Sequence, residues 1–283
     1  MKKTSLTWTI AILLGAAAVM LFLKGQSGNI IAPTNQPQDT KPLPLEAAED
    51  GVKIYGTAWG MTLSEDGSGF YNELIRLFLN GLETPVQYDI LPYRRAKALF
   101  YRDTESCLYP SNINLLMDGG EISSAEGLID TRGILNVKVY VFSPPGTVPP
   151  ASAHDVDHRS VAYAMGSRVP FFLRGANADF IAVANESDKA RMLLSGRVDL
   201  MTAAMPDAKF VFEAMQKPLP PLNPEYELNN TLARVTCHDT PKNRAFVAAF
   251  NSHAMAVLEG DKAQALMLEN RLDAASYLPP PKP

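Results

Sequence analysis

The stretch VKIYGTAW (52–59), with the turn SEDGSG (64–69) and the apolar run that begins at Phe70, decides the fold. Its first segment is rich in β-branched and aromatic residues, which favour a strand, and the glycine-rich turn ends that strand. From Phe70, apolar residues recur at i+4, i+7 and i+8, which predicts a helix over 70–82 with one buried face. A strand, a turn and a helix in this order begin a parallel α/β unit.

The same alternation continues along the chain. A second strand at 86–91 leads to Pro92, a residue that favours a helix start, and a short third strand carries Cys107. Past the prolines near residues 144–150 the pattern restarts, and strands separated by helices predict an α/β fold of two lobes, each a mostly parallel sheet flanked by helices. The further predicted elements are strands at 159–165, 179–184, 197–203 and 228–237, and helices at 93–100, 169–174, 186–194, 207–216 and 243–272.

An apolar run from Ser5 to Leu23 follows the basic N-terminus Met1-Lys2-Lys3. A helix of about 19 residues spans roughly the 30 Å hydrocarbon layer of a bilayer, which indicates an uncleaved membrane anchor. A signal peptide cleaved near Ala16-Ala17-Ala18 is the alternative, although the apolar run continues beyond that site. Because the lysine pair precedes the run, the sequence predicts a single-pass inner-membrane protein whose globular head lies in the periplasm.

The predicted organisation starts with the membrane anchor at 1–24. A flexible linker follows at 25–50, where prolines lie among polar residues that cannot bury a core. The remaining predicted parts are lobe 1 at 51–145, lobe 2 at 146–227, the return strand and C-terminal helices of lobe 1 at 228–278, and a disordered tail at 279–283.

The composition, with 46% hydrophobic and 20% charged residues, is typical of a globular protein. A net charge of −4 argues against nucleic acid as a partner, because phosphate binding needs a basic surface. Cys107 and Cys237 are the two cysteines, and in an oxidising compartment they are expected to form one disulfide. Two buried free thiols are the alternative, while the spacing does not match a zinc site.

Catalytic and metal-binding motifs are sparse. His154 and His158 lie four residues apart, as in some helical metal sites, but they fall in a proline-flanked connector without an evident third ligand. We interpret this segment as a solvated linker. No nucleophile elbow, phosphate-binding loop or dinucleotide fingerprint occurs in the sequence, so we expect neither a metal nor a cofactor.

Several short motifs, taken in their order along the chain, resemble the type 2 periplasmic solute-binding proteins, in particular the family-3 group that includes amino-acid-binding proteins. The motifs are WGM (59–61), DGSGF (66–70), LPYRRA (91–96), VFSP (141–144) and LSGRVDL (194–200). The resemblance implies that the chain leaves lobe 1, builds lobe 2 and returns, with ligand held in the cleft between them. It also implies that Cys107 and Cys237 lie on neighbouring strands of lobe 1, which supports the disulfide.

One departure from that family concerns the ligand. Its amino-acid binders usually carry an arginine, shortly before the Phe-Ser-x-Pro segment, that grips the α-carboxylate of the ligand. The corresponding residues 109–120 contain no arginine, and the next one is Arg132. The resemblance therefore does not extend to a free amino acid as ligand.

Candidate ligand-binding residues follow from the rule that open α/β sheets bind ligands beyond the carboxyl ends of their strands. Trp59 could stack on a flat ligand, and Arg94 or Arg95 could clamp a carboxylate or phosphate. Arg95 matches a recurring arginine of the family. Core packing, a solvated charged face, or a plain turn or helix cap are the alternatives for these positions. The other candidates are Tyr93, Tyr109, Ser111, Gly166, Ser167 and Asn185.

These observations predict a membrane-tethered extracytoplasmic protein that closes on a small ligand. If the arginines bind this ligand, we expect it to be an anion. An inner-membrane transporter or sensor is expected to recognise the closed form. One alternative is enzymatic, because some periplasmic members of the fold are dehydratases that act on cyclic acids such as arogenate or prephenate. Glu186 is then the candidate general acid. Another alternative is a docking module whose cleft has degenerated.

Overall fold

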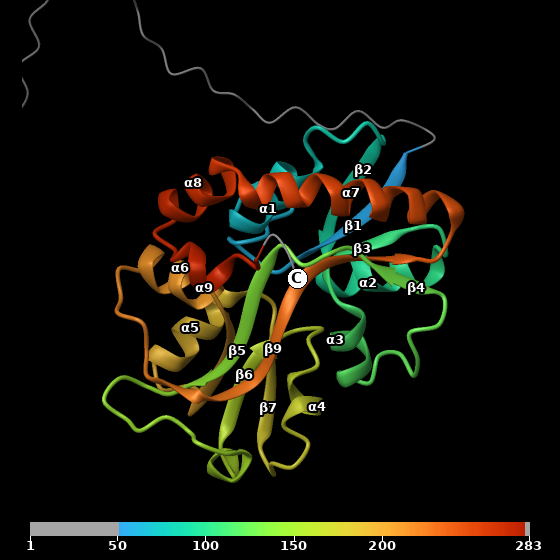
Figure 1. The fold of residues 1–283 in the computed structure, drawn as a ribbon. Helices are drawn as coiled ribbons and strands as arrows, with labels where there is room; N and C mark the ends of the chain where they lie inside the picture. Colours follow the sequence, from blue (N-terminus) through green and yellow to red (C-terminus); the bar gives the residue numbers. More distant parts are fainter. Residues whose placement is uncertain (1–50, 281–283) are drawn as a thin grey trace, which may run out of the picture. The chain divides into compact units, whose positions relative to one another are not determined.

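The computed structural model describes residues 51–280 (Figure 1). The predicted membrane anchor at 1–24 and the predicted linker at 25–50 lie outside the described residues, as does 281–283 of the predicted tail. Between residues 51 and 280, no helix combines the length and the apolar character that crossing a bilayer requires.

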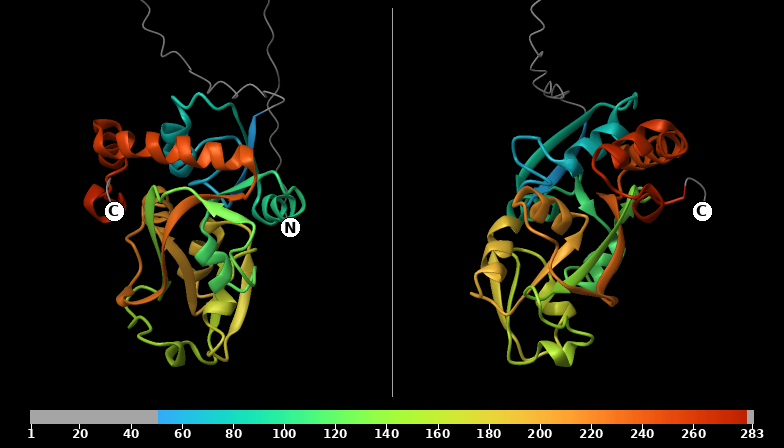
Figure 2. Two further views of the ribbon diagram at one scale, coloured as in Figure 1. Left: turned by 45° about the vertical axis from the view of Figure 1, so that its right-hand side comes forward. Right: turned by 90° about the vertical axis from the view of Figure 1, so that its left-hand side faces the viewer.

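Lobe 1 consists of the first strands and helices of the described chain together with its C-terminal helices. The elements are β1 (Val52–Ala58), α1 (Phe70–Leu79), β2 (Val86–Pro92), α2 (Tyr93–Arg102), β3 (Cys107–Ser111), α3 (Ile113–Asp118), β4 (Leu128–Asp130), α7 (Pro241–Glu259), α8 (Asp261–Glu269) and α9 (Ala274–Tyr277). In the left view of Figure 2, the orange-red helix α7 lies across the upper end of the described chain, and lobe 2 lies below it.

Lobe 2 and the two strands that connect it to lobe 1 lie between these segments in the sequence. The connecting strands are β5 (Leu135–Phe142) and β9 (Leu222–His238), and lobe 2 contains the short 3-10 helix η1 (Ala153–Val156), β6 (Ser160–Ala164), α4 (Val169–Phe172), β7 (Asp179–Val183), α5 (Glu186–Leu194), β8 (Leu200–Met205) and α6 (Asp207–Ala214). The predicted alternation of strands and helices is confirmed.

The strands of the described chain form one continuous nine-stranded sheet, in the order β2-β1-β3-β9-β5-β8-β6-β7, with β4 paired to β9. In lobe 1, β1 is parallel to β2 and β3, and in lobe 2, β6 is parallel to β7 and β8. In contrast, β9 is antiparallel to β3, β4 and β5, and β5 is antiparallel to β8. The prediction of mostly parallel sheets is therefore corrected to mixed sheets, because the returning strand enters lobe 1 in the opposite direction.

The returning strand β9 is 17 residues long and joins the two lobes. Its first part pairs with β5, and its last part pairs with β3 and β4 (Figure 1). The sequence predicted a start near Leu228, because Pro224 and the polar residues around it are typical of a turn. Pairing with β5 overrides this local preference and extends the strand back to Leu222. β5 itself falls within 51–145 yet pairs with β8 of lobe 2, so the boundaries of the lobes stay predictions.

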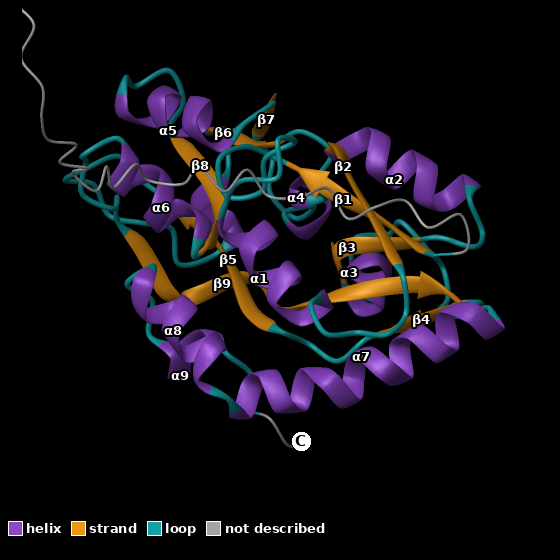
Figure 3. Cartoon of the chain, turned by 90° about the horizontal axis from the view of Figure 1, so that it is seen from above, coloured by secondary structure: helices purple, strands orange, loops and turns teal. Residues whose placement is uncertain are grey.

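Helices cover both faces of the sheet in each lobe. In lobe 1, Val52 and Ile54 pack against the core formed with α1 and α7, whereas Tyr55 packs against Ala96 and Phe100 of α2. This division follows from the alternation of side chains along a strand. Figure 3 shows α7 and α2 on opposite sides of β1 and β3. Lobe 2 has two core clusters as well, one with α5 and α6 and one with α4.

Helix α1 ends at Leu79, three residues before the predicted end at Leu82. The backbone is extended at Asn80, and Gly81 has a φ of 98°. That positive φ is readily adopted by glycine and is incompatible with a continued right-handed helix. The apolar periodicity of the sequence passes through this glycine, so it could not locate the end of the helix.

The two cysteines are bonded to each other. Cys107 on β3 lies directly opposite Cys237 on β9, and their sulfur atoms form a disulfide. Both side chains are fully buried in the core of lobe 1. The predicted disulfide is confirmed, on the neighbouring strands that the family resemblance implied.

Candidate functional site

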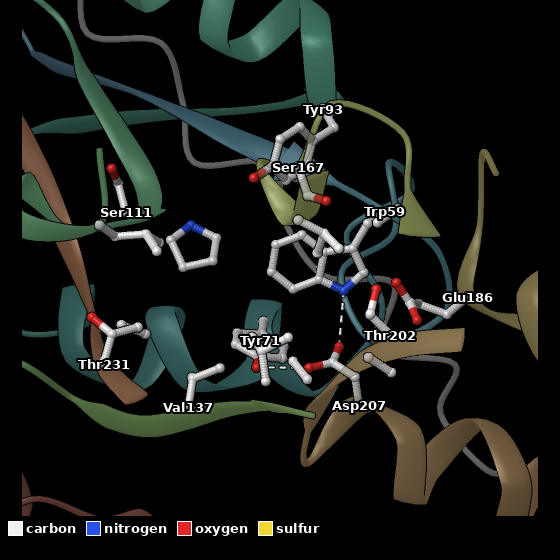
Figure 4. Close-up of a pocket in the computed structure, with 18 of the residues that line it drawn as sticks. Trp59, Tyr71, Tyr93, Ser111, Val137, Ser167, Glu186, Thr202, Asp207 and Thr231 are labelled. Carbon is white, nitrogen blue, oxygen red and sulfur yellow. Dashed lines mark hydrogen bonds between the residues drawn. The ribbon is translucent and has the colours of Figure 1, made fainter. Parts of the chain in front are cut away.

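A cavity of about 160 Å³ lies where the two lobes meet (Figure 4). Lobe 1 lines it with residues that follow β1, begin α2 and end β3, and lobe 2 lines it from β8 and from the starts of α5 and α6. The connecting strands contribute Val137 of β5 and Thr231 of β9. Because an apolar cavity of roughly 150 Å³ accepts benzene, this cavity has the size for a compact ligand of about one ring.

Three aromatic side chains of lobe 1 form part of the cavity wall. The ring of Trp59 lies 5.0 Å from the ring of Tyr71 in an edge-to-face arrangement, and 6.2 Å from the ring of Tyr93. Trp59 directly follows β1 and Tyr93 directly follows β2, so both stand at carboxyl ends of parallel strands. These rings provide a flat apolar surface on which a planar or apolar ligand can stack.

A buried carboxylate connects the two lobes beside this aromatic wall. Asp207, the first residue of α6 in lobe 2, is 2% exposed. Its Oδ1 accepts hydrogen bonds from the Trp59 indole nitrogen at 2.9 Å and from the Thr62 hydroxyl, and its Oδ2 accepts one from the Tyr71 hydroxyl at 2.8 Å (Figure 4). All three donors belong to lobe 1. Burial raises the pKa of Asp207, since a desolvated site penalises the charged form.

A second buried carboxylate is paired with a lysine. Nζ of Lys189 lies 2.7 Å from Oε2 of Glu186 and donates a hydrogen bond to the Thr202 carbonyl oxygen at 2.5 Å. Burial raises the pKa of Glu186, and the positive charge of Lys189 opposes that shift. The cavity is thus lined by two carboxyl groups and one ammonium group that is already bonded. None of its lining residues in the described chain is an arginine.

Two hydroxyl groups at the cavity have no hydrogen-bond partner among the described residues. They are Oγ of Ser111, at the end of β3 in lobe 1, and Oγ of Ser167, in the turn after β6 in lobe 2. A buried hydroxyl without a partner costs about 1–3 kcal/mol. A ligand in the cavity that bonds to both hydroxyls would contact both lobes.

The structure brings four of the predicted ligand residues together at the cavity, namely Trp59, Tyr93, Ser111 and Ser167. Arg94 and Gly166 lie beside it, where they line a separate groove on the outer side of the same lobe interface. Asn185 caps α5, because its side-chain oxygen accepts a hydrogen bond from the Asp188 backbone nitrogen at 2.8 Å. It also lines a pocket of about 520 Å³ together with Trp59 and Arg94.

Two predicted residues lie away from the cavity. Tyr109 is completely buried in the core of lobe 1, and its hydroxyl donates a hydrogen bond to the Tyr71 carbonyl oxygen at 3.1 Å. The next two residues of β3, Pro110 and Ser111, line the cavity instead. Arg95 is exposed on α2, because Ala96 and Phe100 occupy the buried face of that helix. Adjacent residues of a helix point in different directions, and of these two exposed arginines it is Arg94 that lines the groove between the lobes.

Sequence reasoning missed Tyr71, Lys189 and Asp207. Tyr71 lies inside a helix whose apolar spacing assigned it no role, and Lys189 lies within α5, away from any strand end. Asp207 carried a usable signal, because it follows β8 almost directly and begins α6, the same position relative to its strand that Glu186 has.

The histidine-containing connector was also a candidate metal site. Nδ1 of His154 lies 2.9 Å from Oδ2 of Asp157, and Nδ1 of His158 lies 3.5 Å from the side-chain nitrogen of Asn177. Throughout residues 51–280, no three histidine, cysteine, aspartate or glutamate side chains gather in a way that could hold a metal ion. The connector therefore has the contacts of a solvated linker.

Comparisons with known proteins place the fold. No model of a known protein family matches this sequence, and no curated protein sequence matches it. Among solved structures, the GluR0 ligand-binding core from Nostoc punctiforme in complex with L-glutamate matches with a TM-score of 0.61 and 12% identity, over 77% of this chain and 98% of that chain.

Two further solved structures match over a similar range. A histidine kinase sensor domain with similarity to periplasmic binding proteins has a TM-score of 0.57 and 15% identity, over 77% of this chain and 95% of that chain. The substrate-binding protein of an amino acid ABC transporter has a TM-score of 0.58 and 11% identity, over 77% and 97%. At such identities the likeness establishes the fold alone, and the described chain has the two-lobed α/β fold of the type 2 periplasmic binding proteins.

Proposed function

We propose that this protein binds one compact solute in the cavity between its lobes and responds to it by a change in lobe closure. The support comes from the geometry of the site. Both lobes line the cavity, and two strands, β5 and β9, connect the lobes in the manner of a hinge. A ligand that contacts both lobes binds the closed form better than an open one, so it shifts the population toward closure.

The observation that carries this proposal is the pair of unpartnered hydroxyls, Ser111 Oγ in lobe 1 and Ser167 Oγ in lobe 2. Hydroxyls that are buried inside a protein nearly always have a partner. Their presence in the wall of one cavity, one from each lobe, supports a ligand that supplies the missing hydrogen bonds. A residue pair with a purely structural role would be expected to bond to the surrounding protein.

The cavity favours a compact, neutral or cationic ligand with an apolar or aromatic face. Trp59 and Tyr93 offer ring surfaces, while Glu186 and Asp207 give the wall more acidic than basic groups. An ionised ligand carboxylate would meet no arginine there, and Lys189 already bonds to Glu186 and to the Thr202 carbonyl oxygen. An anion inside this cavity would therefore be desolvated without a strong partner, which is costly.

We further propose that the head is held outside the inner membrane by the N-terminal anchor and is recognised by a transporter or sensor. The apolar run Ser5–Leu23 and the disulfide, a bond that persists in oxidising compartments, support this placement. A phosphatase reporter that is active only in an oxidising compartment, fused after Pro283, is expected to be active. An inactive fusion, made at normal level, would contradict the periplasmic placement.

The proposal is tested by a thermal-shift screen of the purified full-length protein in detergent. The compounds should include small amines, aromatic alcohols, amides, amino acids and organic acids. A ligand present at 100 times its dissociation constant stabilises a protein by about 2.7 kcal/mol, which is readily detected. We expect the largest shifts from ring-sized neutral or cationic compounds, and shifts confined to organic acids would overturn the assignment of ligand class.

Ser111→Ala and Ser167→Ala are each expected to weaken binding of a screened ligand by about tenfold, the loss of one net hydrogen bond. Isothermal titration calorimetry measures this change. Ser195→Ala is the matched control, since Ser195 is exposed at the end of α5 and does not line the cavity. Equal affinities for all three variants and the wild type would remove the hydroxyl pair from the site.

An enzymatic role is favoured by one observation, the raised pKa of Glu186 in the cavity wall. A carboxyl group whose pKa is raised by burial holds its proton more strongly than a free one and can act as a general acid. Turnover of a cyclic acid such as prephenate by the wild type, lost in Glu186→Gln, would support this role. A ligand that binds and is recovered unchanged supports a binding protein, and the absence of any ligand would favour a docking module.

A further inference from the structure

A second concave surface spans the two lobes on the outer side of the cavity. We call it the basic groove, and its volume is about 700 Å³, within the usual range for small-molecule sites. Ser167 lines both the groove and the cavity, so the two are neighbours separated by the turn after β6. The residues that define the basic groove are Arg94, Lys97 and Glu121 of lobe 1 and Arg168, Phe171 and Arg174 of lobe 2.

The charge of the basic groove is opposite to that of the whole protein. It contains four cationic side chains and one carboxylate, whereas the chain as a whole carries a net charge of −4. The carboxylate of Glu121 is bonded to Lys97, with Nζ–O distances of 2.6 and 2.9 Å. Arg94, Arg168 and Arg174 form no salt bridge with any carboxylate in residues 51–280. Three guanidinium groups therefore face the groove without a protein anion.

Two of these guanidinium groups are held in place by the protein. The ring of Phe171 contacts both, with the Cζ of Arg168 5.3 Å and the Cζ of Arg174 4.7 Å from the ring centroid. The Nε of Arg168 also donates a hydrogen bond to the Gly119 carbonyl oxygen of lobe 1. Such stacking on an aromatic ring leaves the N–H edges of a guanidinium available for oxyanions.

The lobe 1 loop that contains Gly119 and Gly120 lets Arg168 and Phe171 of lobe 2 approach its backbone closely. Gly120 has a φ of 65°, and a Cβ atom at that position would lie 2.9 Å from the Phe171 ring. Only glycine fits there without displacing the ring. Phe171 and Arg168 of lobe 2 are thus seated directly against lobe 1, and Arg94 lines the same groove from α2. A ligand that contacts both sides requires the lobe arrangement seen in this structure.

We propose that the basic groove is a second ligand site, specific for a compact organic anion that carries at least two oxyanion groups, such as a polycarboxylate or a phosphate ester. Guanidinium groups bind carboxylates and phosphates through paired, charge-assisted hydrogen bonds. Three such groups without a carboxylate partner among the described residues match more than one oxyanion. This site is distinct from the cavity, whose wall is acidic, and it does not depend on what the cavity binds.

The test is calorimetric titration of the purified full-length protein with citrate and with pyrophosphate at low ionic strength. Arg94→Gln and Arg174→Gln are each expected to weaken binding at least about tenfold, because each removes charge-assisted hydrogen bonds. Arg95→Gln is the matched control, since it removes the same charge one residue away, from an exposed position outside the groove. It is expected to leave the affinity unchanged.

Two results would overturn the proposal. The first is that neither citrate nor pyrophosphate binds at millimolar concentration. The second is an equal loss in Arg94→Gln and Arg95→Gln, which would indicate unspecific attraction to a basic surface. Ser111→Ala separates the two sites: it is expected to leave citrate and pyrophosphate binding intact, and a loss in this variant would place the anion in the cavity instead. Comparison of the two probes indicates whether the site prefers carboxylates or phosphates.

Discussion

Removal of the disulfide between Cys107 and Cys237 is expected to lower the free energy of unfolding by about 2–5 kcal/mol. The two cysteines are 130 residues apart, so the bond closes a loop that contains all of lobe 2. A cross-link over so long a loop strongly restricts the unfolded chain, and this restriction is the main source of the expected stabilisation. In the folded state, β3 and β9 remain paired through their backbones without it.

Denaturant unfolding of the Cys107→Ala/Cys237→Ala variant measures this loss. Because both side chains are fully buried, the variant also loses packing contacts, and the reduced wild type provides the control in which no atoms other than the bond are changed. Similar losses in both would assign the effect to the cross-link. A double variant as stable as the oxidised wild type would show that the bond makes no net contribution.

Asp207→Ala is expected to destabilise the association of the lobes by about 2 kcal/mol or more. The substitution leaves the hydroxyls of Tyr71 and Thr62 without their carboxylate acceptor, at about 1–3 kcal/mol for each buried donor. The Trp59 indole nitrogen keeps a bond to the Thr62 hydroxyl oxygen at 2.8 Å. Because these donors are in lobe 1 and Asp207 is in lobe 2, we expect a larger radius of gyration in X-ray scattering as well as lower stability.

Asp207→Asn is the control for this experiment, since the amide keeps an oxygen acceptor and a similar shape. It is expected to retain the compact form. Equal radii of gyration for the alanine variant and the wild type would contradict a role of Asp207 in holding the lobes together. An asparagine variant as expanded as the alanine variant would show that the charge, rather than the hydrogen bonds, is what the closed form requires.

The difference in stability between the wild type and Asp207→Asn is expected to depend on pH. The pKa of Asp207 is raised in the folded state above its usual 3.8, because burial disfavours the charged form. Its stabilising contribution is therefore complete below pH 3.8 and is lost as the pH rises through the folded-state pKa. As the pH rises above 3.8, the stability of the wild type is expected to fall relative to Asp207→Asn until Asp207 is ionised in the folded state. Parallel stability curves from denaturant titrations would contradict this linkage.

Local sequence patterns predicted most elements of the fold. Helix α5 begins and ends where the sequence placed it, because its Asn185 cap and its apolar spacing are both local signals. The early start of β9 was missed, since its first residues resemble a turn and become a strand only by pairing with β5. The direction of β9 was missed for the same reason, because strand order and direction depend on residues far apart in the chain.

The candidate site was predictable only in part. Trp59 and Ser111 were found because strand ends form the binding edge of an α/β sheet. Arg94 and Arg95 could not be separated, since adjacent residues of a helix differ only in their rotation about its axis, which the sequence does not place relative to lobe 2. Asp207 was not recognised as an interlobe contact, because its hydrogen-bond partners precede it by more than 130 residues.

By itself, the sequence determined most of the elements, their order and the α/β class, because propensity, periodicity and turn chemistry act over a few neighbouring residues. It also determined the cysteine pair, because it contains two cysteines. Only the tertiary structure decided which side chains meet across the lobes: an acidic, aromatic cavity on one side of Ser167 and a basic groove on the other. These contacts depend on how the sheet passes through β5 and β9 from one lobe to the other, and that path is set by long-range packing.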